Sequence, residues 1–166
     1  MASKSYIKRN LKSLVHKYEN STTLTEKSYF SKLAIIELCG WIEVSMDEML
    51  EKHGKKLLSK NFSIYKEKLD QTYGFTKKRH LDPLIIHLIG LRGYERLMKS
   101  CDEIIIQKLS SDLGTLKTKR DDLAHAYIKA FTNTYDSPQK TLSTFHSIAN
   151  GLDHLDDKLT DLRKHL

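Results

Sequence analysis

The most regular feature of this 166-residue sequence is a run of apolar residues near its C-terminus, spaced alternately three and four positions apart. Apolar residues at this spacing lie along one side of an α-helix and form a seam like that of a coiled coil. Ser137 and Pro138 precede the run and predict where the helix begins, because serine caps helices and proline suits their first position. The seam can pack inside a helical bundle or against a second copy of the chain, and the sequence leaves both alternatives open. Its members are Phe145, Ile148, Leu152, Leu155, Leu159, Leu162 and Leu166.

Four further segments carry helical signals. Apolar residues recur at helical spacing over residues 5–18 and 102–130, and Asp82 before Pro83 predicts the start of another helix. A capping-box pattern from Thr23 to Glu26 opens a helix that we expect to reach residue 52. Apolar residues surround the axis of this last helix, so we predict that it is buried on all sides. They are Leu33, Ile35, Ile36, Leu38, Trp41, Ile42, Val44 and Met46.

No segment alternates between apolar and polar residues with a period of two, and only two prolines and seven glycines interrupt the chain. We therefore predict an all-α fold in which residues 1–166 form a single domain. The expected architecture is an up-and-down helical bundle of about five helices.

Charge and cysteine content narrow the expected surroundings of the protein. The formal net charge of +7 favours an acidic partner, with nucleic acid ahead of a membrane surface. Two cysteines, Cys39 and Cys101, are too few for a disulfide framework or a zinc cluster and suit a reducing compartment. The N-terminus lacks an apolar leader, and the longest apolar stretch is too short to cross a bilayer. We expect a cytoplasmic protein without a membrane partner.

The segment from residue 52 to residue 80 is strongly basic and contains nine lysine and arginine residues. Its cations are interleaved with Phe62, Tyr65, Tyr73 and Phe75, a composition that fits an RNA track in which phosphates meet lysines and bases stack on rings. The alternative is a solvated helix whose aromatic side chains attach it to the core. The candidate RNA-binding residues are Lys55, Lys56, Lys66, Lys68, Lys77, Lys78 and Arg79.

A cluster of polar residues around Arg120 and His125 offers the chemistry of RNA phosphodiester cleavage. A histidine can move protons near neutral pH, and an arginine keeps its charge and grips phosphate with a planar fork. Asp121 lies one helical turn before His125, where a carboxylate favours the imidazolium and orients the ring. This chemistry requires neither a metal nor a cofactor, and the sequence lacks a glycine-rich phosphate loop and an HExxH motif.

The spacing of this cluster constrains how it can work. Arg120 and His125 are about 140° apart around a helix, so one helix cannot easily aim both at a single phosphate, whereas two facing copies can. The same residues could instead form a structural network on the surface, and Arg9 with His16 shows that such pairs also arise by chance. Glu37 and Glu43, on the helix predicted to be buried, need partners: one could pair with Arg120, or both could reach the edge of the bundle.

The segment Arg120-Asp121-x3-His125 resembles the signature of HEPN domains, an all-helical family in which arginine, a polar residue and histidine lie on a late helix of the bundle. The resemblance implies a homodimer in which the two signature helices form a metal-independent endoribonuclease site. It also implies a toxin or an antiviral defence effector as the biological role. Other members of the family have lost catalysis, which leaves a non-catalytic module that binds nucleotide, RNA or a protein as the alternative.

One branch of that family carries Arg-x4-His-x-Tyr, and Arg120, His125 and Tyr127 match all three positions. The resemblance implies a nucleotidyltransferase antitoxin as a possible partner, which adenylylates the tyrosine and silences the toxin. The length of the chain and its basic segment before His80 depart from the compact members of this branch. A third interpretation, a structural dimerisation domain built on the C-terminal seam, does not use Arg120 or His125.

Overall fold

The computed structural model describes residues 1–125 and 135–164, and for Ala124 and His125 it describes the backbone alone. It contains no strand in these residues, which confirms the all-α prediction. Six α-helices and one π-helical turn occur there, where we had predicted about five helices. They are α1 (Lys4–Glu19), α2 (Leu24–Gly54), α3 (Ser59–Asp70), the π-helical turn η1 (Lys77–Leu81), α4 (Asp82–Ser100), α5 (Glu103–His125) and α6 (Pro138–Leu162).

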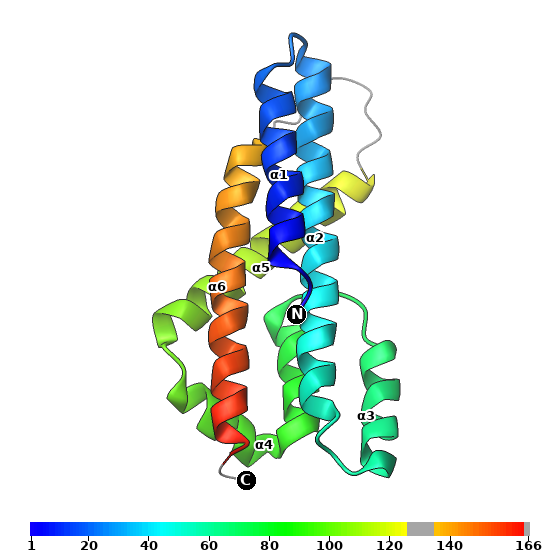
Figure 1. Cartoon of the computed structure of the whole chain (residues 1–166), viewed down its shortest axis with the longest axis vertical. Helices are drawn as coiled ribbons and strands as arrows, with labels where there is room; N and C mark the ends of the chain where they lie inside the picture. The colour runs from blue at the N-terminus through cyan, green and yellow to red at the C-terminus, as the bar shows by residue number, and fades with distance from the viewer. Residues whose placement is uncertain (126–134, 165–166) are drawn as a thin grey trace.

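Helices α2 and α6, the two longest, run along the molecule, and the shorter α1 lies against both of them towards the end away from α3 and α4 (Figure 1). Helix α5 crosses behind them obliquely, and α3 and α4 lie at the end where α2 finishes (Figure 1). The arrangement is therefore less regular than the up-and-down bundle that we predicted. Trp41 of α2 meets Phe145 of α6 edge to face, with 5.0 Å between ring centroids, and joins two of the long helices in the core.

Two predicted helix starts are confirmed by their capping bonds. The backbone N–H of Glu26 donates to Thr23 Oγ1 over 3.2 Å at the start of α2. The backbone N–H of Lys140 donates to Ser137 Oγ over 3.3 Å at the start of α6. Each bond satisfies one of the backbone donors that a helix N-terminus leaves without an intrahelical partner.

The C-terminal seam packs inside the chain, against helices that include α1, α2 and α5. Five of its members are buried, and Leu162 is partly buried against the same core. Leu166 lies outside the described residues. Because these side chains are packed in the core of one copy, the described part of the seam offers no surface to a second copy. The alternative in which the seam packs inside a helical bundle is therefore confirmed. The buried five are Phe145, Ile148, Leu152, Leu155 and Leu159.

Helix α2 is not buried on all sides, which corrects our prediction. Tyr29, Leu33, Ile36 and Val44 lie along one face of the helix and are each between 43% and 56% exposed. The helices that pack along this part of α2 cover its other faces and leave this one open. We call these four residues the α2 stripe. Gly40, in line with them, is also exposed and has no side chain or neighbouring backbone within 4 Å of the position that a Cβ would occupy.

The start of α4 also differs from the prediction. Asp82 does not cap the helix, because η1 runs directly into α4 and places Asp82 inside helical backbone. Its carboxylate instead accepts hydrogen bonds from the Lys77 ammonium, at 2.7 Å and 3.0 Å. Further along, Gly90 adopts a φ of 71° and breaks the helical path of α4, a conformation that glycine tolerates best. Within the described ranges, none of the helices has the length and apolar character needed to cross a bilayer.

Candidate functional site

Arg120 is held on α5 by contacts from two other parts of the chain. Its Nη1 donates to Glu43 Oε1 of α2 over 2.7 Å. Its guanidinium also lies over the ring of Phe75, in the segment before η1, with 4.9 Å between Cζ and the ring centroid. The Arg120 side chain remains 34% exposed, so solvent or a ligand can still reach it.

The two glutamates of α2 have separate partners. Glu43 pairs with Arg120, one of the two alternatives that the sequence left open, and its partly exposed side chain also reaches the edge of the bundle. Glu37 accepts a hydrogen bond from Asn10 Nδ2 of α1 over 3.3 Å. Glu43 is therefore the glutamate that positions the guanidinium.

Asp121 lies between two cations of its own helix. Its Oδ2 accepts from the Lys117 ammonium, and its Oδ1 lies 3.5 Å from Arg120 Nη2. These contacts lower the pKa of Asp121, with the hydrogen bond from Lys117 as the largest cause and the charges of Lys117 and Arg120 adding to it. The carboxylate is thus ionised near neutral pH and contributes one negative charge beside the guanidinium.

The other two residues of the matched pattern fall largely outside the described part. His125 is the last residue of α5, and its side chain is not described; Tyr127 lies outside the described residues altogether. The α5 backbone is continuous from Arg120 to His125, so the helical separation of about 140° between them applies. The rise between the two Cα atoms is about 7.5 Å.

The charges around Arg120 balance. Arg120 and Lys117 supply two positive charges, and Glu43 and Asp121 supply two negative ones. Cys39, one turn before Glu43 on α2, is buried, and burial raises the pKa of its thiol to about 12 although the charge of Arg120 acts in the opposite direction. The thiol is therefore protonated at neutral pH and is no nucleophile.

The seven predicted RNA-binding cations have different surroundings. Lys55 and Lys66 are tied to carboxylates, Lys55 to Glu51 at 2.8 Å and Lys66 to Asp70 at 2.7 Å. Lys77 is buried, and its ammonium contacts Asp82 and the Tyr94 hydroxyl. Lys77 is therefore not available to a phosphate at the surface. The remaining four, all exposed, are Lys56, Lys68, Lys78 and Arg79.

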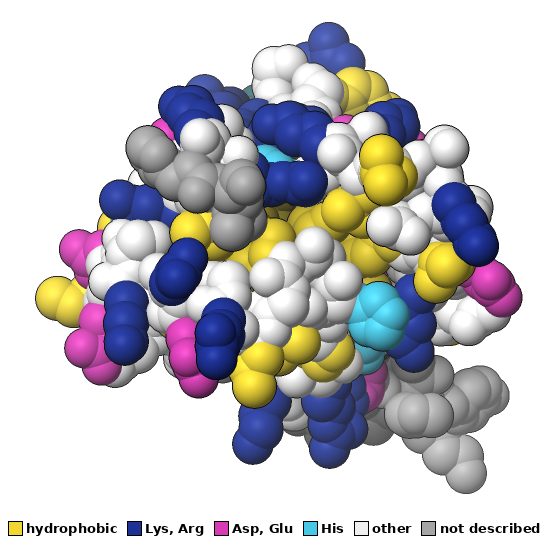
Figure 2. Space-filling model, turned by 90° about the horizontal axis from the view of Figure 1, so that it is seen from below, with side chains coloured by type: hydrophobic (Ala, Val, Ile, Leu, Met, Phe, Trp, Pro, Cys, Tyr) yellow, Lys and Arg dark blue, Asp and Glu magenta, His cyan; other side chains and the backbone are white. Residues whose placement is uncertain are grey.

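The aromatic residues of the same segment mostly face inward. Tyr65 and Phe75 are buried in the core and Phe62 is half-buried, whereas Tyr73 is 85% exposed. This arrangement supports the alternative in which aromatic side chains attach the segment to the core. From the end of the molecule shown in Figure 2, Lys and Arg side chains are scattered among apolar, polar and acidic groups and form no single basic patch on that face.

Sequence reasoning missed two partners of the site. For Phe75 the sequence left base stacking and attachment to the core as alternatives, and neither of them paired it with Arg120. Lys117 was not singled out, although its spacing of four residues from Asp121 is a signal for an ion pair on a helix. In the described ranges, no group of three or more His, Cys, Asp or Glu side chains is arranged to hold a metal ion. Comparison of the chain with protein-family models, curated proteins and solved structures gives no match.

Proposed function

We propose that this chain is a metal-independent endoribonuclease that acts as a homodimer, with Arg120 and His125 forming the site between two copies. The observation that carries the proposal is the setting of Arg120. Glu43 and Phe75 fix its guanidinium at the surface, on the same continuous helix as His125. In phosphodiester cleavage a fixed, partly exposed arginine can stabilise the charge on the phosphoryl oxygens, and a histidine can transfer the protons. The resemblance of this segment to the HEPN signature supports the same function.

The proposed reaction uses the substrate's own ribose. A base takes the proton of the 2′-hydroxyl, the 2′-oxygen attacks the adjacent phosphorus, and the bond from phosphorus to the 5′-oxygen breaks. An acid returns a proton to that leaving oxygen, so the products are a 2′,3′-cyclic phosphate and a 5′-hydroxyl. His125 supplies the proton transfer, and Arg120 stabilises the charge on the phosphoryl oxygens. Arginine has five N–H donors, so Arg120 can contact phosphate while it keeps its bond to Glu43.

The homodimer follows from the divergence of Arg120 and His125 around α5, and the α2 stripe offers a surface for it. The stripe includes Val44, the neighbour of Glu43, so it adjoins the site directly. Four large apolar side chains in line on an exposed face favour burial against a partner. In a two-fold dimer the same patch of both copies meets, so docking through the stripe would place the Glu43–Arg120 pairs of the two copies beside one shared interface.

The balanced charges of the site favour a second candidate function, a non-catalytic module that binds nucleotide, RNA or a protein. Glu43 and Asp121 both lie against the guanidinium, so a phosphate must compete with two carboxylates for it. The biological setting that we propose for the catalytic form is that of a toxin or defence effector. A nucleotidyltransferase that adenylylates Tyr127 is its possible antitoxin, as in the branch that the sequence resembles.

Cleavage of a fluorescent RNA separates these functions. Wild-type protein should cut in the presence of EDTA, and Arg120→Ala and His125→Ala should each lower the rate about 100-fold or more. Arg9→Ala and His16→Ala are the matched controls, because both residues are exposed on α1 and should leave the rate unchanged. Loss of cleavage with EDTA, or full activity in His125→Ala, would overturn the mechanism. RNA binding that needs Arg120 without any cleavage would establish the non-catalytic module instead.

A further inference from the structure

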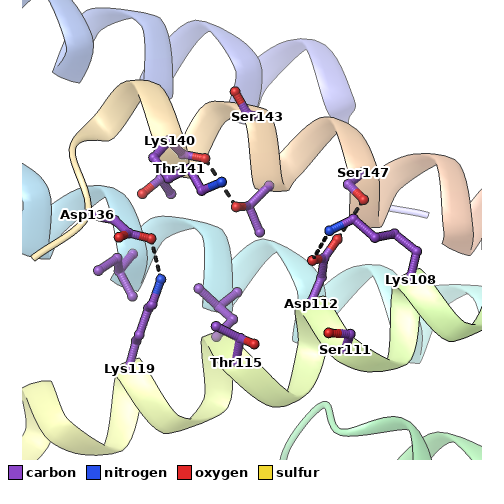
Figure 3. A pocket seen from close by; sticks show the side chains of 13 residues that line it. Lys108, Ser111, Asp112, Thr115, Lys119, Asp136, Lys140, Thr141, Ser143 and Ser147 are labelled. Carbon is purple, nitrogen blue, oxygen red and sulfur yellow. Dashed lines mark hydrogen bonds and ion pairs between the residues drawn. The ribbon is translucent and has the colours of Figure 1, made fainter.

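A polar groove of about 430 Å³ lies between α5 and α6, on a face of α5 that does not carry Arg120 (Figure 3). Its volume is within the range of pockets that bind small molecules. The groove has an apolar floor made by Ile35 of α2 and Leu116 of α5. Its described polar lining includes Lys108, Asp112, Lys119, Asp136, Lys140 and Ser147.

The groove exists because α5 and α6 approach closely at one point and separate from there. At Gly151 of α6 an added Cβ would lie 2.9 Å from Leu109 Cβ, so the two helices are in tight contact there. One turn towards the start of α6, Ser147 Oγ donates to Asp112 over 2.6 Å and closes this end of the groove. The ion pair between Lys119 and Asp136 bounds the opposite end (Figure 3).

The two ends of the groove differ in the charge that they can offer. Near the start of α6, Lys119 and Lys140 supply two cations beside a single carboxylate, Asp136. Within the described part of the chain, Lys140 has no ion pair, so its ammonium is available to an anion. The N-terminus of the 25-residue helix α6 adds a favourable potential for negative charge at this end.

The rest of the groove suits hydroxyl groups. Ser147 and Lys108 both contact Asp112 at the far end, and Lys108 lies 2.7 Å from it. Hydroxyl side chains from both helices line the space between the ends. None of the described lining residues is aromatic, so the groove offers no platform on which a nucleobase could stack. The apolar floor fits the C–H face of a sugar better than an extended aromatic ring.

We propose that this groove binds a sugar phosphate, a ribose phosphate in particular, with the phosphate at Lys119 and Lys140 and the sugar hydroxyls towards Asp112 and Ser147. Phosphate is recognised by the two lysines through charge-assisted hydrogen bonds. The Asp112 carboxylate accepts hydrogen bonds from the sugar hydroxyls, and the serine and threonine hydroxyls can both accept and donate them. The same chemical unit occurs as a free metabolite and within an RNA strand. The site uses none of the residues proposed for RNA cleavage, so the two proposals stand or fall separately.

Isothermal titration calorimetry with D-ribose 5-phosphate tests the proposal on the full chain. Wild-type protein should bind it saturably and more tightly than ribose or inorganic phosphate. Lys140→Gln should weaken binding about tenfold or more by removing a charge-assisted contact, and Lys12→Gln, which removes an exposed charge on α1, should not. Thr115→Phe keeps every charge and fills the groove from an exposed position, so it should abolish binding without lowering the thermal stability measured by circular dichroism.

The proposal would be overturned if millimolar D-ribose 5-phosphate showed no saturable binding. Equal binding by wild-type protein and Thr115→Phe would overturn it as well. Binding of ribose 5-phosphate no tighter than inorganic phosphate would also contradict it, because the sugar would then contribute nothing. A six-nucleotide RNA added as competitor to His125→Ala protein, which should not cut it, distinguishes the sources. Displacement of ribose 5-phosphate by the RNA supports a groove that follows an RNA strand, and no displacement supports a free sugar phosphate as the ligand.

Discussion

Replacing Gly151 with alanine should destabilise the fold, even though alanine favours helices more than glycine does. The new Cβ would lie 2.9 Å from Leu109 Cβ and 3.0 Å from Leu109 Cδ1, and Leu109 is fully buried, so α5 and α6 must move apart. Overpacking of this kind costs about 1–3 kcal/mol, and the gain in helix propensity returns about 1 kcal/mol. We expect the free energy of unfolding to fall by about 1 kcal/mol, which lowers the Tm by roughly 3 °C.

Gly114→Ala is the matched control for this substitution. Gly114 lies inside α5, and nothing approaches within 4 Å of the position of its Cβ, so this variant should gain about 1 kcal/mol from helix propensity alone. Urea unfolding followed by circular dichroism gives both values under one set of conditions. If Gly151→Ala raises the free energy of unfolding as much as Gly114→Ala does, the close contact that opens the polar groove does not exist.

Two further predictions follow from buried and exposed charges. Burial lowers the pKa of His53, whose Nε2 contacts Asp156 and whose Nδ1 has no hydrogen-bond partner in the described part. As the pH falls below about 6.5, the unfolded state therefore binds more protons than the folded state. The free energy of unfolding, measured by urea titration, should drop from pH 7 to pH 5, and this drop should be smaller in His53→Gln. If RNA contacts the exposed cations, replacing Lys78 and Arg79 by glutamine should reduce the slope of the logarithm of the RNA-binding constant against the logarithm of the salt concentration by about 1.4. Lys77→Gln should lower stability and leave this slope unchanged, because Lys77 is buried against Asp82. An equal effect of each of the three substitutions on the slope would refute this difference between buried and exposed lysines.

The elements that the sequence predicted well are those that depend on nearby residues. The caps at Thr23 and Ser137 need only a side chain and a backbone N–H three residues away, and both form as expected. The seam of α6 is a local repeat, and its regularity is enough to indicate a buried helix face. Helix α3 lies in the basic segment for which the sequence left two interpretations open, and the helical spacing of Phe62, Tyr65 and Leu69 is the local signal that favours the solvated helix.

The features that the sequence did not predict depend on partners far away in the chain. Whether an apolar face is buried depends on how many helices pack around it. No described helix covers the face of α2 that carries Ile36, so this side chain is exposed. Asp82 is an exception, because its partner Lys77 is only five residues away. It has the local pattern of a cap, but η1 runs directly into α4 and places it inside helical backbone. Phe75 and Arg120 meet across a separation that no local pattern encodes. The arginine of the site could be chosen from its sequence motif, and Glu43 was one of two candidates for its partner, but the contact with Phe75 could not be predicted.

Mixing two inactive variants tests the composite site most directly. Arg120→Ala protein and His125→Ala protein are unfolded together, refolded together and assayed for RNA cleavage. If Arg120 of one copy works with His125 of the other, each mixed dimer holds one intact site of two. Half of the dimers should be mixed, so the mixture should recover about a quarter of wild-type activity. A mixture as inactive as either variant alone, from wild-type protein that does cleave RNA, would contradict the shared site.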